Sequence, residues 1–106
     1  MDYQVKNMIV NALMKIVEDA PTKQDEPYYV SVSYPKIYGV RKEYFDIWTN
    51  YIFSVMKIIS SYVDVSICLS NINGIIMQPC PNNEYTSQVN AICRIILDFA
   101  QKILYL

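Results

Sequence analysis

The sequence predicts an α+β fold, a small two-layer α/β sandwich with the element order α-β-α-β-β-α. Three observations lead to this fold class. Residues 4–20, 42–62 and 84–105 carry apolar side chains at helical spacing. In residues 28–34, two tyrosines and two valines alternate with Tyr29 and two serines, which is typical of a short strand with one buried face. Residues 63–79 contain Asn73-Gly74 between two apolar runs, the pattern of a β-hairpin.

The first predicted helix, residues 4–20, has more apolar surface than one core face needs. Val10 and Met14 widen the apolar arc beyond the positions that recur at helical spacing, which are Val5, Met8, Ile9, Ala12, Leu13, Ile16, Val17 and Ala20. Pro21 ends the helix, and residues 21–27 form a polar connector. Because the extra apolar surface needs a cover, we expect Met8, Val10 and Met14 to form the interface of a homodimer.

The second predicted helix, residues 42–62, follows the short strand and a turn at residues 35–40. Its predicted core face consists of Phe45, Trp48, Tyr51, Ile52, Val55, Met56, Ile59 and Tyr62. Phe53 falls near the polar side of this helix. A large aromatic side chain at such a position is a candidate contact for a partner protein.

The register of the hairpin at residues 63–79 follows from which side chains share a face. A three-residue loop, Ile72-Asn73-Gly74, places the apolar residues of both strands together, whereas a two-residue turn separates them. In that register Cys68 and Cys80 are diagonal neighbours, too far apart for a relaxed disulfide. The last helix, residues 84–105, begins after Pro81-Asn82-Asn83.

The predicted fold leaves one helix without a complete partner. A three-stranded sheet is wide enough for two helices on one face, so the third helix must cover the other face, stack on the other helices or meet a second subunit. We expect a homodimer for this reason. A monomer in which the three helices form their own layer is the alternative.

Length and composition limit the classes of protein to which this chain can belong. A chain of 106 residues fits a single domain, residues 1–106, and its net charge of −1 gives no general attraction to nucleic acid or acidic membranes. The chain has no histidine, and Cys68, Cys80 and Cys93 lack the spacing of metal ligands. We therefore expect no metal, no cofactor and no catalytic residues. No apolar stretch predicts a membrane span or a targeting signal, so we expect a cytoplasmic protein.

Five of the ten tyrosines fall within residues 28–44, interleaved with basic side chains. We expect a partner protein to bind this surface, because tyrosine and arginine are favoured in interface hot spots. The candidate residues are Tyr29, Lys36, Tyr38, Arg41 and Lys42, together with Phe53. Two other interpretations remain: the same residues could bind single-stranded nucleic acid, or they could be strand core beside a solvated edge. The tyrosine total itself could reflect an A/T-rich genome.

These observations predict a small, tyrosine-rich, non-enzymatic interaction protein that acts as a homodimer. Its size and composition suit an accessory protein of a virus, phage or plasmid. One alternative function is single-stranded nucleic-acid binding through residues 28–42. The other is binding or sensing of a small molecule in a pocket at the subunit boundary.

Overall fold

The computed structural model describes residues 1–21, 40–80 and 84–106. In these residues the chain forms helices and no strand: α1 (Tyr3–Glu18), α2 (Lys42–Ile59), α3 (Ser66–Ile76) and α4 (Thr86–Leu104). The predicted α+β sandwich with a three-stranded sheet is therefore wrong. The described part of the chain is a helical bundle.

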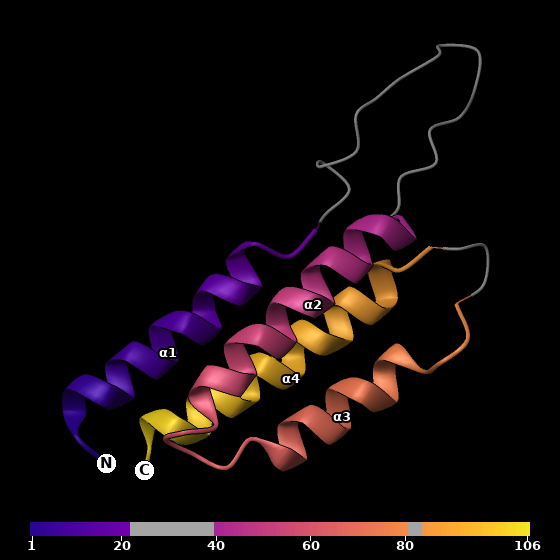
Figure 1. Cartoon of the computed structure of the whole chain (residues 1–106). Helices are drawn as coiled ribbons and strands as arrows, with labels where there is room; N and C mark the ends of the chain where they lie inside the picture. The colour runs from indigo at the N-terminus through magenta and orange to yellow at the C-terminus, as the bar shows by residue number, and fades with distance from the viewer. Residues whose placement is uncertain (22–39, 81–83) are drawn as a thin grey trace, which may run out of the picture.

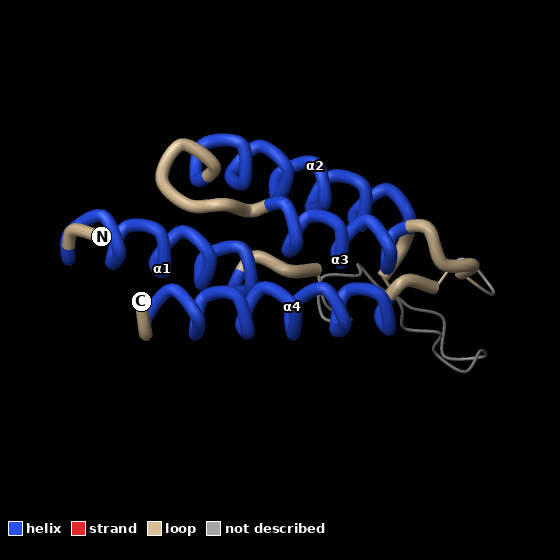
Figure 2. Tube along the Cα trace, turned by 90° about the horizontal axis from the view of Figure 1, so that it is seen from below, coloured by secondary structure: helices blue, strands red, loops and turns tan. Residues whose placement is uncertain are grey.

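Consecutive helices of the bundle run in alternating directions, so both ends of the chain lie at the same end of the molecule (Figure 1). This is the up-down-up-down arrangement of four-helix bundles. Helix α4 packs most extensively on α1 and next on α3, while α1 makes a smaller contact with α2. Figure 2 shows α2 and α4 on opposite sides of the bundle, with α1 and α3 between them.

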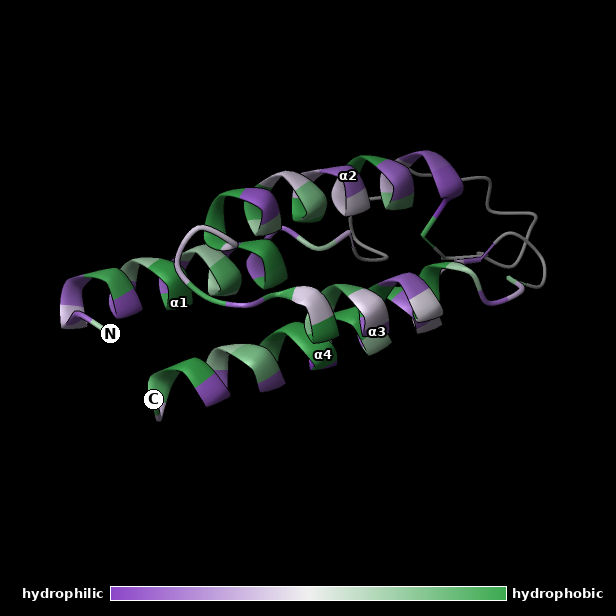
Figure 3. Ribbon diagram, turned by 60° about the horizontal axis from the view of Figure 1, so that its bottom comes forward, coloured by the Kyte–Doolittle hydropathy of each residue, from purple (hydrophilic) through white to green (hydrophobic). Residues whose placement is uncertain are grey.

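The predictions of helices at residues 4–20, 42–62 and 84–105 are confirmed with shorter bounds. Each helix is amphipathic, and hydrophobic and hydrophilic residues alternate along the ribbons in Figure 3. The buried side chains recur every three or four residues, which places them on one face of each helix. They are Ile9, Leu13 and Ile16 in α1, Phe45, Trp48, Ile52, Met56 and Ile59 in α2, and Val89, Ile92, Ile96, Ala100 and Ile103 in α4.

Some residues assigned to these core faces are largely exposed. Met8 and Tyr62 both belong to the exposed apolar side chains. Met8 lies at the margin of the arc that α1 buries, and Tyr62 lies in the turn that follows the end of α2 at Ile59.

The predicted hairpin at residues 63–79 is wrong, because α3 occupies this segment. Cys68 and Ile72, one helical turn apart, are buried, and Leu69, Ile75 and Ile76 pack against the core from its edge. Before the helix, Asp64 Oδ1 accepts hydrogen bonds from Ser66 N at 2.9 Å and Ser66 Oγ at 2.7 Å. This aspartate-centred turn starts the helix, a role that aspartate often has at helix N-termini.

The strand predicted at residues 28–34 and most of the predicted connector at residues 21–27 lie outside the described residues. The same holds for Pro81-Asn82-Asn83, which was expected to start the last helix. These three predictions stay untested.

A buried hydrogen bond joins α1 to α2. The indole Nε1 of Trp48 donates to the carbonyl oxygen of Ile16 at 3.0 Å. Ile16 lies in the last turn of α1, where carbonyl groups lack partners within the helix. Trp48 therefore gives a hydrogen-bond donor to a carbonyl group at the end of α1, while its ring is buried between the two helices.

The carboxylate of Glu84 joins the start of α2 to the start of α4. Its Oε2 accepts from Val40 N at 3.0 Å, and its Oε1 accepts from Thr86 N at 2.9 Å. Thr86 Oγ1 donates to Oε2 as well, and Tyr85 N donates to Val40 O at 3.0 Å. Next to this junction, the Phe45 and Tyr85 rings stack with centroids 4.6 Å apart.

Replacing Glu84 by glutamine tests this junction. The Glu84→Gln change removes the negative charge and one acceptor oxygen, while three donors stay in place. Hydrogen bonds to a charged group contribute more than neutral ones, so we expect unfolding free energy to fall by about 2 kcal/mol in urea denaturation.

The matched control is Glu43→Gln, because the Glu43 side chain is 65% exposed and lies 3.9 Å from Arg41 Nη1. We expect this control to change stability by about 0.5 kcal/mol or less. Equal losses in the two variants would contradict the structural role of Glu84.

Candidate functional site

Helix α2 carries a second apolar stripe beside its buried face, and two tyrosines at the inner edge of this stripe, Tyr44 and Tyr51, are half-buried against the core. Ile47 and Ile58 are each 67% exposed, and they lie on nearly the same side of the helix because they are eleven residues apart. With them lie tyrosine and serine positions at three- and four-residue spacing, and Tyr62 follows in the turn after α2. We call this set the α2 seam: Tyr44, Ile47, Tyr51, Ser54, Ile58, Ser61 and Tyr62.

The seam positions are uncharged, but Glu43 lies one turn before Ile47 on the same side of α2, while Lys42, Asp46 and Lys57 lie on other sides. Two largely exposed isoleucines on the outside of a helix are unusual for a surface that meets only water. The seam's spacing of three and four residues is the spacing with which one helix packs against another.

Beside the first half of the seam lies an open groove of about 460 Å³ between the end of α1 and α2. Its lining is mostly apolar and consists of Asp19, Pro21, Tyr44, Ile47, Trp48 and Tyr51. The seam and the groove therefore form one continuous apolar surface.

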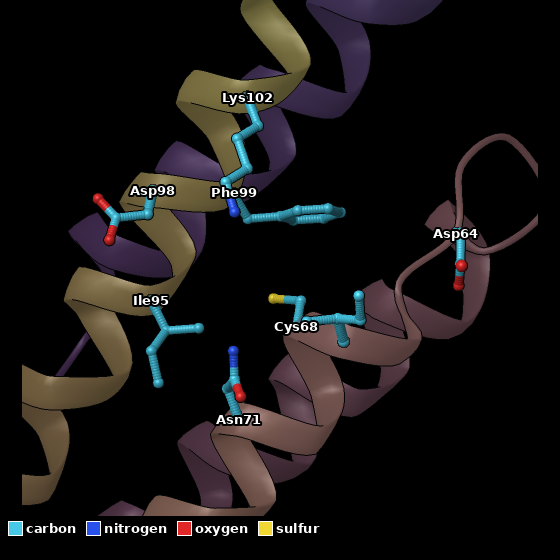
Figure 4. A pocket seen from close by; sticks show the side chains of 8 residues that line it. Asp64, Cys68, Asn71, Ile95, Asp98, Phe99 and Lys102 are labelled. Carbon is cyan, nitrogen blue, oxygen red and sulfur yellow. The ribbon is translucent and has the colours of Figure 1, made fainter.

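A second, smaller cavity lies between α3 and α4. It has a volume of about 250 Å³ and is lined by Asp64, Ile67, Cys68, Asn71, Ile95, Asp98, Phe99 and Lys102. Figure 4 shows Lys102 and Asn71 reaching toward the space between the helices, while the Asp98 carboxylate turns away from α3. Apolar side chains thus form the walls, and nitrogen-bearing groups extend into the space.

Two side chains of this cavity have shifted pKa values. Burial raises the pKa of the Cys68 thiol to about 11, against a smaller lowering effect of the Lys102 charge. Cys68 is therefore a neutral thiol at pH 7 and not an activated nucleophile. The hydrogen bonds from Ser66 lower the pKa of Asp64, because they favour its charged form.

The structure describes only part of the predicted partner surface. Tyr29, Lys36 and Tyr38 lie outside the described residues. Arg41 and Lys42 are exposed at the start of α2, where Lys42 Nζ lies 2.7 Å from Asp46 Oδ2 and Arg41 Nη1 lies 3.9 Å from Glu43 Oε1. These basic groups thus have carboxylates beside them, which reduces the local positive charge.

Phe53, the remaining predicted partner residue, is half-buried and packs against the core from the edge of α2. Its aromatic ring therefore already has protein neighbours within the bundle. The partner role of these residues stays a prediction.

The three residues predicted for the dimer interface do not share one face of α1. Val10 and Met14 are one turn apart on the same side, and Val10 is half-buried while Met14 is 38% exposed. Met8 is 51% exposed but lies on a different side of the helix, since residues of a helix follow one another at about 100°. Ile47 and Ile58 are more exposed than any of the three.

Sequence reasoning missed the α2 seam and the cavity for different reasons. The stripe on α2 could have been found in the sequence. Tyr44, Ile47 and Tyr51 follow one another at intervals of three and four residues, and Tyr51, Ser54 and Ile58 repeat these intervals. The cavity could not have been noticed, because it requires α3 to be a helix.

None of the described helices has the length and apolar character that crossing a membrane requires. Across residues 1–21, 40–80 and 84–106, no group of three or more Cys, Asp or Glu side chains is placed to hold a metal ion. Cys68, Cys80 and Cys93 are free thiols. The chain matches no known protein family, no curated protein and no solved structure.

The lowered pKa of Asp64 predicts how its contribution to stability depends on pH. A carboxyl group with a lower pKa in the folded state stabilises the fold above its unfolded pKa, and this contribution is lost as pH falls through the folded pKa. We expect Asp64→Ala to be less stable than the unmodified chain at pH 7. The difference should shrink as pH drops below about 3.9, the ordinary aspartate pKa.

Urea denaturation of both proteins between pH 2 and pH 7 measures this difference. Ser66→Ala is the matched control, since it removes the hydroxyl donor and keeps the backbone donor. It should show a smaller difference with the same pH dependence. A constant difference over the whole pH range would contradict the role of the Asp64 carboxylate.

Proposed function

We propose that this chain is a non-enzymatic interaction protein that acts as a homodimer joined along the α2 seam. The observation that carries the proposal is the pair of isoleucines on the outer side of α2, Ile47 and Ile58, each 67% exposed. Apolar side chains gathered on one surface mark interaction sites, because their exposure to water is unfavourable.

The sequence of the seam is self-complementary, which favours a second copy of the chain as its occupant. In an antiparallel pairing about a two-fold axis between residues 52 and 53, Ile47 faces Ile58 of the partner subunit. In the same register Tyr51 faces Ser54 of the partner subunit, and Tyr44 faces Ser61 of the partner subunit. Large side chains thus meet small ones, and isoleucine meets isoleucine.

Two-fold dimers use the same patch on both subunits, so an interface that matches itself when reversed fits this symmetry. The helical part of the seam runs from Tyr44 to Ile58, which is about 21 Å along α2, and Ser61 and Tyr62 follow the end of the helix. In this register Glu43, which lies beside the seam, faces Tyr62 of the partner subunit, so the two-fold axis brings no like charges together there.

The proposal keeps the predicted homodimer but moves its interface from Met8, Val10 and Met14 on α1 to α2. Tyr44 belongs both to the seam and to the tyrosine-rich segment at residues 28–44, so a further partner protein bound by that segment would lie beside the dimer interface. An intracellular location is part of the proposal, because three free cysteines suit a reducing compartment.

The interface and its register can be tested by charge substitution. We expect Ile47→Glu to raise the dimer dissociation constant at least tenfold, because it places a carboxylate against an apolar side chain of the partner subunit. Combining Ile47→Glu with Ile58→Lys should restore dimerisation, since each introduced carboxylate then faces an introduced ammonium group. Sedimentation equilibrium measures the dissociation constant, and circular dichroism confirms that each variant is folded.

The control for exposed isoleucine in general is Ile67→Glu, because Ile67 on α3 is 73% exposed and lies off the seam. It should leave the dimer intact. In a parallel pairing, residue 47 would face its own copy and the double variant would not be rescued. A monomeric unmodified chain, or a double variant that stays monomeric, overturns the proposed interface.

A further inference from the structure

The cavity between α3 and α4 has the character of a binding site for a small organic anion. Its walls are apolar, formed by Ile67 and Cys68 of α3 and by Ile95 and Phe99 of α4. Its volume of about 250 Å³ is below the range of drug-sized sites, so it suits a small ligand.

The groups that extend into this space are hydrogen-bond donors. Lys102 extends from α4 toward Phe99, and Asn71 extends from α3 between Ile95 and Cys68 (Figure 4). An ammonium group donates only, and an amide nitrogen donates two hydrogens. Together they can meet the two oxygens of one carboxylate, and the pairing with Lys102 is assisted by charge.

Two carboxylates also line the cavity, and Asp64 stays negatively charged at pH 7 because the hydrogen bonds from Ser66 favour its charged form. Asp98 is directed away from α3 (Figure 4). Asp64 lies at the start of α3, where its Oδ1 accepts the backbone N–H and the hydroxyl of Ser66. The Cys68 thiol is neutral at pH 7, because burial raises its pKa to about 11.

We propose that the cavity between α3 and α4 binds a small monocarboxylate with an apolar body, such as an acid of the size of hexanoate. The carboxylate contacts Lys102 and Asn71, and the hydrocarbon body lies against Phe99, Ile95 and Ile67. This site is independent of the proposed dimer, because the α2 seam lies on another helix.

Titration of the isotope-labelled protein with sodium hexanoate, followed by NMR, tests the site. We expect saturable shifts of the amide signals of residues 67–71 and 95–102. Hexylammonium and hexanol have the same apolar body without the carboxylate, and both should bind at least tenfold more weakly. Equal binding of either compound, or shifts that do not saturate, overturns the proposal.

Variants locate the anion-binding group. Lys102→Met keeps much of the side-chain length and should weaken hexanoate binding at least tenfold, while Lys57→Met on α2 should leave it unchanged. Both lysines are exposed, so folding is retained, and thermal melts verify this. Asp98→Asn should bind hexanoate as well as the unmodified chain or better. Unchanged binding by Lys102→Met, or loss in Lys57→Met or Asp98→Asn, overturns the assignment.

Alkylation of Cys68 gives a second measurement that does not depend on NMR. Saturating hexanoate should slow the reaction of Cys68 with iodoacetamide at pH 9 at least threefold, because the ligand body covers the thiol. The rate at Cys80, which is not among the cavity residues, should not change. Equal rates at Cys68 with and without hexanoate count against the site.

Discussion

The arrangement of this bundle depends on the junction that Glu84 makes between α2 and α4. One carboxylate accepts hydrogen bonds from Val40 N, Thr86 N and Thr86 Oγ1, and Tyr85 N donates back to Val40 O. The starts of two helices more than forty residues apart in the chain are thereby held together. Together with the hydrogen bond from Trp48 to Ile16, this junction favours the rotation of α2 that buries Phe45, Trp48 and Ile52. That rotation turns Ile47 and Ile58 outward.

Sequence reasoning located α1, α2 and α4, but it predicted a hairpin where the structure has α3. Long segments such as residues 84–105 contain enough turns for the period of 3.6 to be unmistakable. The segment at residues 63–79 is shorter, and its apolar residues fit both the helical period of 3.6 and the strand period of two. The Asn73-Gly74 pair favoured a hairpin, and the comparison of turn lengths assumed strands on both sides. In the structure, Gly74 lies within the last turn of α3, where the space beside its α-carbon is open.

The candidate sites were predictable to different degrees. Excess apolar surface directs attention to the outer sides of helices, and the interface that it predicts stays a prediction. Periodicity alone does not show which edge of a helix its neighbours cover. Tyr62 was assigned to the core and is half-exposed, whereas Phe53 was assigned to a partner and packs against the core. The α3–α4 cavity depends on the tertiary arrangement that places Cys68, Ile95 and Phe99 around one space, which no local pattern encodes. The seam and the cavity occupy different helices, so one chain can use both.

The hydrogen bond between Trp48 and Ile16 makes the protein an optical reporter of its own packing. The chain has a single tryptophan, so its fluorescence comes from one place, the buried boundary of α1 and α2. Its emission reflects whether the indole is shielded from solvent and bonded to the end of α1. Separation of these two helices can therefore be followed in the unmodified chain, without a dye or an introduced label.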